Sequence, residues 1–526
     1  MAELSILAHR ILDWVGKKPE LDVLTFVSID REGNLIDEVR TYRELWENGQ
    51  RLAQALHDRG MRKGDSFSLV MANHPEFVDL MVASSILGTI FVPIDPRTRG
   101  DKLKYMLDFA DCRGAVVADY ALDNVAGAWA NRDDVWIMPL GTDRSDDIAT
   151  LLAAEVPSPA LDIASNDPSE PMQLLYTSGT TGDPKAIMTA HSRLAMAEVI
   201  AGALGLSESD RPYTGLSLTH ANAQLITLGC ILTLGLRGVI SRKFTRSRLW
   251  DITRAYGCTW FNLLGGMTTA VYAQPRRDDD ADNPVRIVLS AGMPAAIWED
   301  FAERFNVDLF EFYGAAEGGL AFNPPGVGPV GSCGKAPPAL ELKILSDDDR
   351  ECAPGEIGEI CFRNADGSSP IVEYFRNPSA SARKTAGGWL RMGDIGHVDE
   401  RGWLYFHYRK GGGIRRNGDF VNTAFVEKVL SEHPGVDDVF VYGVPIEGGA
   451  PGEKNLVAAI VPVDRETLDT DRLFSYCAAR LEKNAIPAYL HLVGEIPKTA
   501  SEKPQERFLL DAFDPAADYI IAGAAR

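Results

Sequence analysis

Apolar runs and helical patterns alternate along the first part of the chain. The run 66–72 (SFSLVMA) has the length of a buried strand, and so does 89–95 (TIFVPID). Between them, 75–88 places apolar residues at helical spacing and begins with a proline, which suits the first turn of a helix. A helical pattern over 101–112 and a strand over 114–119 continue the series. This alternation predicts a parallel sheet covered by helices.

A second series of the same kind lies between residues 193 and 292, and the pattern of predicted elements changes further along the chain. The expected elements are helices over 193–205 and 247–257 and strands over 238–242, 259–265 and 285–292. After about residue 325 the segments shorten and turn signals become frequent. Alternating runs on both sides of the DERG sequence at 399–402 predict a β-hairpin or meander.

Three consecutive glycines at 411–413 predict a domain boundary, because they cannot hold a regular element without a large entropic cost. We therefore expect an N-terminal domain over 1–409, a hinge over 410–413 and a small C-terminal domain over 414–526. In this last domain, 424–445 reads as a helix followed by a strand. The expected fold class is α/β, with helix-covered parallel sheets and a β-rich subdomain, followed by a small mobile α+β domain.

Composition and charge narrow the class of protein. The formal net charge of −21 excludes a general nucleic-acid binder, which needs a basic face. The seven cysteines form no CxxC pair, so neither a disulfide framework nor a zinc site is predicted. The amino-terminal residues lack the pattern of a signal peptide, and the longest apolar stretches, 80–94 and 226–240, are too short for a membrane span. We expect a cytoplasmic protein.

The stretch 174–188 (LLYTSGTTGDPKAIM) follows a strand-like run with hydroxyls, glycines and a lysine. Backbone amides, hydroxyls and one lysine can hold a phosphate, whereas an ordinary surface turn is the alternative. The loop is not a Walker loop, because Ala186 follows the lysine. Its candidate phosphate-binding residues are Thr177, Ser178, Gly179, Thr180, Thr181, Gly182 and Lys185.

This loop resembles the signature loop of the acyl-adenylate-forming superfamily, and further motifs resemble that family in family order. They are SAGMP at 290–294, EFYGAAEGG at 311–319, GWLRMGDIG at 388–396, YRKGGGIRRNGDFV at 408–421 and IPKTASEKPQER at 496–507. The resemblance covers most of the chain from residue 172 onward, and the region from Thr41 to Asp65 is similar to the family's N-terminal part. The chain is identified as a member of this superfamily, which contains acyl-CoA synthetases, adenylation domains and luciferases.

The resemblance implies an AMP-forming acyl-CoA synthetase. Such an enzyme joins a carboxylic acid to the α-phosphate of ATP, releases pyrophosphate, and then passes the acyl group from AMP to the thiol of CoA. ATP and CoA would be co-substrates, and Mg²⁺ would be the metal ion. A homodimer is compatible with this class.

The resemblance also implies roles for individual residues. Lys503 would reach the α-phosphate and the carboxylate during adenylation, with Lys498 as a weaker candidate, and Glu317 would ligate Mg²⁺. Asp394 would accept hydrogen bonds from the ribose, assisted by Arg409. Other residues matched to the ATP or AMP site are Gly292, Met293, Pro294, Phe312, Tyr313, Gly314 and Ala316. Taken singly, each of these residues also fits an ordinary structural role.

The acid and the thiol have their own candidates. His220 matches a position at the mouth of the acyl pocket, and the other candidate pocket residues are Tyr213, Asn222, Gln224, Phe261 and Phe312. Gly411 matches the hinge, and Gly418 matches a glycine of the CoA tunnel. No acidic residue is placed to bind an α-amino group, which disfavours amino acids. The identity of the acid is left open.

The sequence departs from the family pattern at three positions. Ala316 stands where threonine is usual, Glu502 replaces the glycine before the late lysine, and Asn417 replaces a glycine near the thiol tunnel. An acidic residue at the position of Glu502 resembles carnitine- and crotonobetaine-ligase-like members. A stand-alone adenylation enzyme that loads a separate carrier protein, a luciferase-like oxidase and a catalytically inactive nucleotide-binding scaffold stay open as alternatives.

Overall fold

The chain forms two units, and the first of them contains a sheet with the predicted alternation of strands and helices. The computed structural model describes residues 3–177, 184–410, 414–416, 419–421, 423–446, 454–499 and 502–523. The chain divides into two units: Met1–Asn262, Asn283–Ile287 and Ile371–Arg383 form the first, and Leu263–Asp282, Val288–Pro370 and Lys384–Arg526 form the second. Each unit therefore combines segments that are far apart in the sequence.

In the first unit, a six-stranded sheet has the strand order β6-β5-β3-β4-β7-β8. All neighbouring strands are parallel except β7 and β8, which are antiparallel. The strands are β3 (Ser66–Val70), β4 (Ile90–Ile94), β5 (Cys112–Ala118), β6 (Trp136–Leu140), β7 (Pro171–Thr177) and β8 (Lys185–Ala190). The associated helices are α2 (Tyr42–Asp58), α3 (Pro75–Leu87), α4 (Gly100–Phe109), α5 (Leu122–Ala128) and α6 (Ile148–Leu152).

The local sequence explains the bounds of α3, which connects β3 to β4. Pro75 occupies its first turn, and Gly88 ends it in the left-handed region with φ of 72°. The helix is buried along almost its whole length, and β3 and β4 are fully buried on both sides. The predicted strand, helix and strand over 66–95 are confirmed, and so are the helix and strand that follow as α4 and β5.

A second group of strands in the first unit has the order β11-β9-β10-β1-β2. Only the β1–β2 pair is antiparallel among these strands. The strands are β1 (Asp22–Ile29), β2 (Leu35–Thr41), β9 (Pro212–Thr214), β10 (Gly238–Ser241) and β11 (Trp260–Leu264). The helices are α1 (Leu7–Lys17), α7 (Met196–Leu204), a π-helix over Asn222–Leu228, α8 (Gly229–Leu234) and α9 (Leu249–Tyr256). The predicted elements over 193–265 are confirmed.

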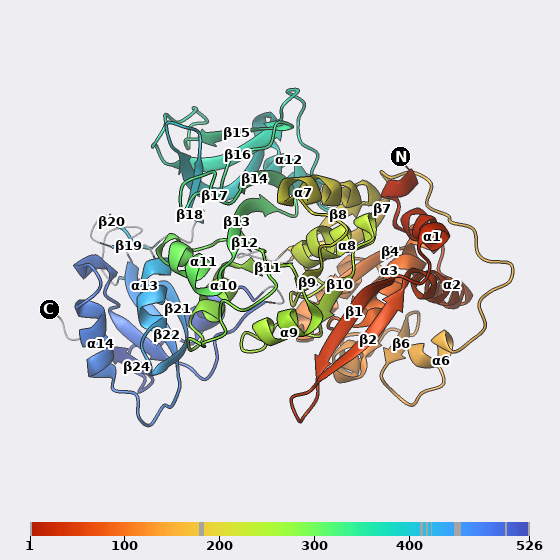
Figure 1. Cartoon of the computed structure of the whole chain (residues 1–526), viewed down its shortest axis with the longest axis horizontal. Helices are drawn as coiled ribbons and strands as arrows, with labels where there is room; N and C mark the ends of the chain where they lie inside the picture. The colour runs from red at the N-terminus through yellow and green to blue at the C-terminus, as the bar shows by residue number, and fades with distance from the viewer. Residues whose placement is uncertain are drawn as a thin grey trace. The chain divides into compact units, whose positions relative to one another are not determined.

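The second unit contains two groups of strands before the C-terminal region (Figure 1). In the first, β12 (Ile287–Ala291), β13 (Asp308–Ala315) and β14 (Gly318–Asn323) are neighbours, and α10 (Gly265–Tyr272) and α11 (Trp298–Phe305) belong to the same unit. In the second, β15 (Leu340–Leu345), β16 (Gly358–Asn364), β17 (Leu390–Val398) and β18 (Leu404–Arg409) form an antiparallel meander. The hairpin predicted around 399–402 is therefore confirmed as β17 and β18. Helix α12 (Pro378–Lys384) precedes β17 in the sequence.

The C-terminal region has its own sheet and core, as Figure 1 shows in blue. Strands β21 (Val436–Pro445), β22 (Lys454–Pro462), β23 (Tyr489–Leu492) and β24 (Ile520–Ala522) form the sheet. The remaining elements are β19 (Arg415–Arg416), β20 (Asp419–Phe420), α13 (Thr423–Ser431), α14 (Thr470–Ala478) and α15 (Glu506–Asp511). Leu430, Leu456 and Leu473 are fully buried between this sheet and its helices. The predicted helix and strand over 424–445 are confirmed, and a separate small C-terminal domain is present.

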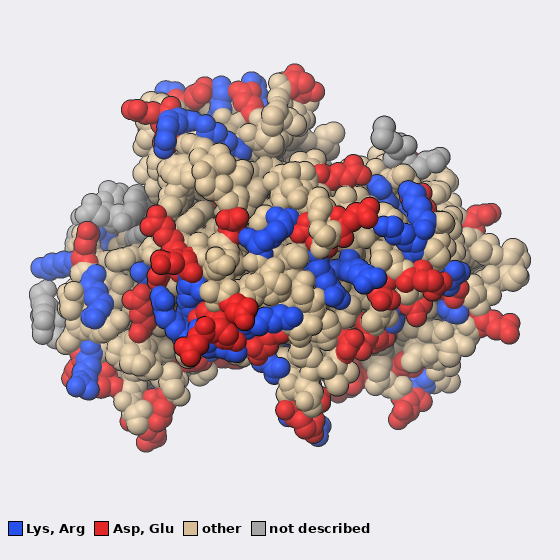
Figure 2. Space-filling model, viewed as in Figure 1, with Lys and Arg blue, Asp and Glu red and all other residues tan. Residues whose placement is uncertain are grey.

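Three observations concern the cysteines, the length of the helices and the surface charge. Each of the seven cysteines is buried with a free thiol. Among the residues that the structure describes, no helix is long and apolar enough to cross a membrane. Figure 2 shows acidic and basic side chains interspersed over the face in view.

A buried carboxylate anchors the loop that follows β12. Glu311 on β13 is 3% exposed, and its two oxygens accept hydrogen bonds from the backbone amides of Gly292 (2.6 Å) and Met293 (3.1 Å). Burial raises the pKa of Glu311 to about 8, although both amide bonds lower it. Gly292 has φ of 101°, a conformation that side chains with a Cβ rarely adopt. Glycine and glutamate together therefore fix this loop.

The buried Glu311 predicts a pH dependence of stability. Its folded pKa lies above the usual value of 4.5, so its contribution to stability is complete below pH 4.5 and is lost as the pH rises to about 8. Glu311→Gln cannot titrate. We expect the melting temperature of the wild type to fall relative to that of the variant across this range, by an amount corresponding to a few kcal/mol. Thermal melts of both proteins at several pH values test this, and a constant difference would contradict it.

Candidate functional site

The pairing of β17 with β18 places Asp394 opposite Arg409. The guanidinium Nε of Arg409 lies 3.8 Å from Oδ1 of Asp394, and the other carboxylate oxygen accepts a hydrogen bond of 2.5 Å from the hydroxyl of Tyr313. Tyr313 belongs to β13 and lies 81 residues before Asp394 in the sequence. Three residues that the sequence assigned to the nucleotide site on separate motifs are thus in contact.

The ring of Tyr313 has two aromatic neighbours. It stacks on Phe362 with a centroid distance of 6.2 Å and lies 6.4 Å from the ring of Phe406. Burial raises the pKa of its hydroxyl, and the neighbouring Asp394 carboxylate raises it further. Tyr313 is therefore a neutral hydrogen-bond donor at neutral pH, with a flat apolar surface next to a carboxylate. Phe406 is 45% exposed and presents an aromatic surface beside it.

Lys503, from the C-terminal domain, lies in the electrostatic environment of the same pair. Withdrawal of its amine from water lowers its pKa, Arg409 lowers it further, and Asp394 raises it. The backbone of the lysine is held by Thr499, whose amide donates a hydrogen bond of 2.8 Å to the carbonyl of Lys503. Lys498, the weaker candidate, is bonded at 2.6 Å to Asp438 within its own domain. Lys503 thus interacts electrostatically with Asp394 and Arg409, whereas Lys498 is paired with Asp438.

A lysine that sequence reasoning missed lies in the same group. Lys384 ends α12, and its amine donates a hydrogen bond of 3.2 Å to the carbonyl of Met392 on β17. Burial lowers its pKa, while the carboxylates of Glu317, Asp394 and Glu359 raise it. The only signal in the sequence was its place shortly before GWLRMGD, and no family motif pointed to it.

Glu317 lies in the turn between β13 and β14, and Gly314 near the end of β13 has no room for a side chain. A Cβ on Gly314 would approach the carbonyl oxygen of Gly319 to 2.8 Å. Phe312 faces the opposite side of β13 from Glu311 and Tyr313 and is buried, 7% exposed. Ala316 precedes Glu317 in the turn. The predicted nucleotide residues of this motif thus divide between the site, the turn and the core.

The glycine-rich loop predicted to hold phosphate joins β7 to β8. Thr177 and Lys185 face each other at the end of this antiparallel pair. The amine of Lys185 lies 5.5 Å from the centroid of the Tyr374 ring. The segment around Tyr374 runs along β8, since Phe375 donates its amide to the carbonyl of Ala186 at 2.8 Å. Ser178, Gly179, Thr180, Thr181 and Gly182 lie outside the described residues, as do Gly411, Asn417 and Gly418.

The candidate acyl-pocket residues separate into two groups. Tyr213 and Phe261 are buried and pack edge to face with centroids 6.4 Å apart. Phe261 also contacts the ring of Trp250 on α9 at 5.4 Å.

The polar candidates lie around the start of the π-helix. His220 accepts a hydrogen bond from the amide of Asn222 at its Nδ1, at 3.2 Å, and the Asn222 side chain is bonded to Asn262 of β11. Sequence reasoning included Phe261 but not Asn262, its neighbour on the other face of the strand.

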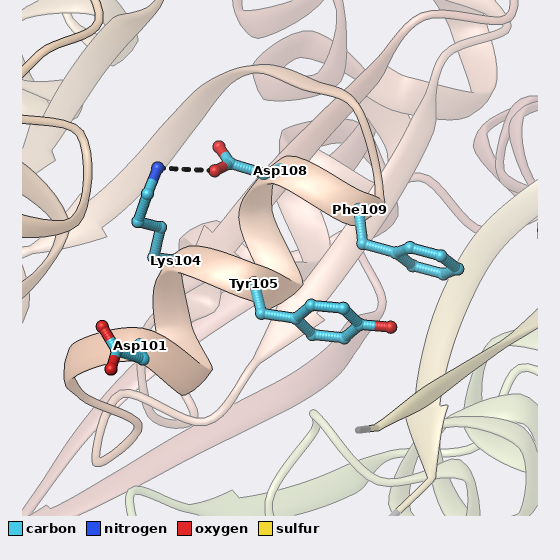
Figure 3. Close-up of a pocket in the computed structure, with 5 residues that line it drawn as sticks. All are labelled: Asp101, Lys104, Tyr105, Asp108 and Phe109. Carbon is cyan, nitrogen blue, oxygen red and sulfur yellow. Dashed lines mark hydrogen bonds and ion pairs between the residues drawn. The ribbon is translucent and has the colours of Figure 1, made fainter. Parts of the chain in front are cut away.

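A surface pocket also lies along α4 in the first unit (Figure 3). Asp101, Lys104, Tyr105, Asp108 and Phe109 line it. Lys104 and Asp108 form an ion pair at 2.7 Å, and the rings of Tyr105 and Phe109 stack at 5.3 Å. None of the residues predicted for the nucleotide, acid or thiol lines this pocket.

Comparison with known proteins places these findings in a family. Residues 13–369 match the AMP-binding enzyme family, and residues 426–503 match the AMP-binding enzyme C-terminal domain. The chain is 30% identical over 483 residues to the medium/long-chain-fatty-acid–CoA ligase FadD17 of Mycobacterium marinum, covering 89% of this chain and 91% of that protein. It is 28% identical to the crotonobetaine/carnitine–CoA ligase of Salmonella enteritidis, covering 88% and 91% of the two chains.

Solved structures share the fold. The anthranilate CoA ligase AuaEII in complex with anthranoyl-AMP superposes with a TM-score of 0.81 at 24% identity, covering 96% of each chain. The o-succinylbenzoate CoA synthetase MenE of Bacillus subtilis, in complex with ATP and magnesium ion, has a TM-score of 0.74 at 24% identity and covers 95% of this chain and 99% of that one. Since the two family models match residues 13–369 and 426–503, this chain belongs to the AMP-binding enzyme family.

Proposed function

We propose that the residues gathered around Asp394 carry out the first half of an AMP-forming acyl-CoA synthetase reaction. The family and the acyl-CoA ligases among the relatives make the chain an enzyme of this kind, an acid–thiol ligase. The observation that carries the residue assignments is the contact of Tyr313, Asp394 and Arg409, with Lys503 in the same electrostatic environment.

Adenylation joins two anions, so the site must offset negative charge and align the reacting groups. The acid's carboxylate attacks the α-phosphorus of ATP, and the bond to pyrophosphate breaks. Lys503 and Arg409 are cations beside Asp394, and cations held in place stabilise the charge that develops in this step. We assign Lys503 to the α-phosphate and the acid's carboxylate.

The residues around Asp394 also offer surfaces that suit the base and the sugar of the nucleotide. Asp394 keeps acceptor capacity beyond its bond with Tyr313, because a carboxylate can accept about four hydrogen bonds. It therefore suits the two ribose hydroxyls. The Tyr313 ring and the loop of Gly292, Met293 and Pro294, which Glu311 anchors, would enclose the adenine. Phe312 is buried on the other face of β13, so its contribution would be structural.

Glu317 fits a magnesium ion better than a transition metal. No group of three or more histidine, cysteine or acidic side chains that could hold a metal is present in the described part of the chain. Mg²⁺ typically takes one or two carboxylates together with substrate phosphates and water, which a single glutamate supports. Bound there, the ion would neutralise phosphate charge. The MenE structure with ATP and magnesium ion supports the same cofactor in a related protein.

The second half-reaction needs the acyl group transferred from AMP to a thiol. CoA is favoured over a carrier protein because the curated relatives are named as CoA ligases. Gly411 as a hinge and Gly418 in a CoA tunnel stay predictions. A cytoplasmic location and a homodimer likewise stay predictions, and no role in nucleic-acid binding is proposed.

The test of this function is product formation with a panel of carboxylic acids. Purified protein is incubated with ATP, Mg²⁺ and each acid, with and without CoA, and pyrophosphate, AMP and thioester are measured. We expect acid-dependent pyrophosphate release, with AMP and thioester appearing only when CoA is added. Thioester formation on a carrier protein but not on CoA would support the adenylation-enzyme alternative. Absence of pyrophosphate with every acid would support the inactive scaffold.

Two substitutions should separate the half-reactions. Lys503→Ala removes the cation assigned to adenylation, so we expect acyl-AMP formation to fall about 100-fold or more, a loss of roughly 2.7 kcal/mol in transition-state stabilisation. Thioester formation from supplied acyl-AMP should persist. Gly411→Pro fixes φ near −65° and should show the reverse pattern. Single-turnover assays of each step test both variants, and equal failure of both in both steps would contradict domain alternation.

Lys384 adds another cation to this site. Its amine is held by the Met392 carbonyl, and three carboxylates, of which Glu317 and Asp394 belong to the proposed nucleotide site, act on its charge. A lysine amine is a suitable partner for phosphate oxygens, and its neighbours Glu317 and Asp394 belong to the proposed nucleotide site. We therefore assign Lys384 to the phosphates, where it would strengthen a site in which Ala316 supplies no hydroxyl.

Replacing Lys384 should weaken ATP binding. A hydrogen bond to a charged group is worth about 1.5–3 kcal/mol, so Lys384→Met should raise KM for ATP roughly tenfold to a hundredfold. Lys384→Arg should recover part of this loss, because it keeps the charge. The matched control is Lys343→Met on β15, whose amine is bonded to Glu351 at 2.7 Å. ATP titrations that give equal KM values for the two methionine variants would remove Lys384 from the phosphate site.

A further inference from the structure

Three side-chain carboxamides are buried together between the π-helix and β11. They belong to Asn222, Gln224 and Asn262, which are 6%, 1% and 2% exposed. Asn222 and Gln224 stand in the first turn of the π-helix, and Asn262 is in the middle of β11. We call these three residues the amide cluster. Buried amides carry strong hydrogen-bonding groups, so each of their polar atoms requires a partner.

The amide cluster is held in one orientation by hydrogen bonds. The Nδ2 amine of Asn262 donates to Oδ1 of Asn222, and the Nε2 amine of Gln224 donates to the carbonyl of Leu218. Leu218 is fixed in turn, since its amide donates to Oδ1 of Asn73 at 2.8 Å. Asn73 donates to the carbonyls of Leu216 (2.8 Å) and Ser241 (2.9 Å). The donors of Gln224 and Asn262 in these bonds are therefore committed to the protein.

The side-chain oxygens of Gln224 and Asn262, in contrast, make no hydrogen bond to the described part of the protein. Oε1 of Gln224 and Oδ1 of Asn262 are buried and have no hydrogen-bond partner within the described residues. Most buried polar atoms in folded proteins are paired, so two unpaired acceptors in one cluster call for an explanation. A π-helix is rare and often lies at a functional site, which points to the same place. These two oxygens have the properties of a binding surface for a hydrogen-bond donor.

The apolar candidates for the acyl pocket do not share this surface. Tyr213 and Phe261 pack on each other, Tyr213 shares a hydrogen bond of 2.9 Å with Ser241, and Phe261 packs on Trp250. Successive side chains of a strand point to opposite faces, so Asn262 faces away from Phe261. The face of β11 that meets the π-helix is thus polar at Asn262. His220, the candidate at the pocket mouth, immediately precedes this helix and bonds to Asn222.

We propose that the oxygens of Gln224 and Asn262 bind a hydroxyl or N–H group on the acyl chain of the acid, so that the substrate is a donor-bearing acid and not a plain alkyl acid. This inference rests on the proposed function. A plain hydrocarbon chain would leave both oxygens unpaired, whereas one donor hydrogen would pair with at least one of them and two donor hydrogens would pair with both. A site built around a substrate hydroxyl or N–H can reject an analogue that lacks it by up to about 10⁴–10⁵-fold.

The first experiment uses the wild-type enzyme and pairs of acids. Hydroxyalkanoic acids that differ only in the position of the hydroxyl, and the corresponding acylamino acids, are each compared with the unsubstituted acid of equal chain length. The readout is kcat/KM from AMP formation with ATP, Mg²⁺ and CoA. We expect one donor-bearing acid to exceed its parent by about 100-fold or more. Unsubstituted acids that equal or exceed every donor-bearing partner would overturn the inference.

The second experiment tests the assignment to these residues. Asn262→Leu and Gln224→Met remove the unpaired oxygens at similar volume, and each should lower kcat/KM for the preferred acid about tenfold or more. The value for the unsubstituted parent should be unchanged or higher, and KM for ATP should be unchanged. A variant that loses activity on both acids equally would contradict the assignment.

The matched control is Gln50→Met. Gln50 is a buried carboxamide on α2 whose two polar atoms are both paired, with the carbonyl (3.1 Å) and the amide (2.8 Å) of Leu161. Its loss should affect stability but not the ratio of kcat/KM between the two acids. Failure of this inference is distinguishable from failure of the proposed function: efficient activation of alkyl acids alone overturns only the inference, whereas no acid-dependent pyrophosphate overturns the function.

Discussion

The register of β17 and β18 is the constraint on which the proposed nucleotide site depends. It places Asp394 opposite Arg409, and the Asp394 carboxylate then accepts the hydroxyl of Tyr313 from a strand of another sheet. A shift of one residue in this pairing would turn one of the two charged side chains to the opposite face of the sheet and separate the pair. The antiparallel partner β16 holds β17 on its other edge, and Glu359 of β16 accepts the amide of Gly393 at 3.1 Å. The site is thus built on paired strands, with its charges fixed by the ladder.

Local charge balance explains how an acidic chain can bind an anion. The formal charge of −21 belongs to the whole sequence, whereas the site combines Asp394, Glu317 and Glu359 with Arg409, Lys384 and Lys503. Carboxylates stabilise the charged forms of Lys384 and Lys503, which desolvation disfavours. Polyphosphate arriving at such a site would meet cations that are already held in position, and a metal ion could share the remaining charge.

One strand, β11, supplies both a polar and an apolar side chain to the proposed acyl region. On β11, Phe261 is used in packing with Tyr213 and Trp250, and Asn262 meets the π-helix. The relatives named above include ligases of medium- and long-chain fatty acids and of crotonobetaine and carnitine, so the family tolerates acids of different polarity. A change of a few side chains on one face of this strand and of the facing helix can alter polarity without a change of fold.

The sequence by itself determined the order of strands and helices, the presence of a small C-terminal domain and the motifs that carry the proposed nucleotide site. Continuous apolar runs mark buried parallel strands, and special residues mark the ends of elements, as Gly88 does for α3. Asp394, Arg409, Tyr313 and Lys503 could be named because family motifs carry them. Lys384 and Asn262 could not, because no local pattern distinguishes a lysine at a helix end or an asparagine in a buried strand. Only the tertiary structure decided which of these groups meet, because the contacts join residues far apart in the chain, and strand register and side-chain alternation select the face on which they lie.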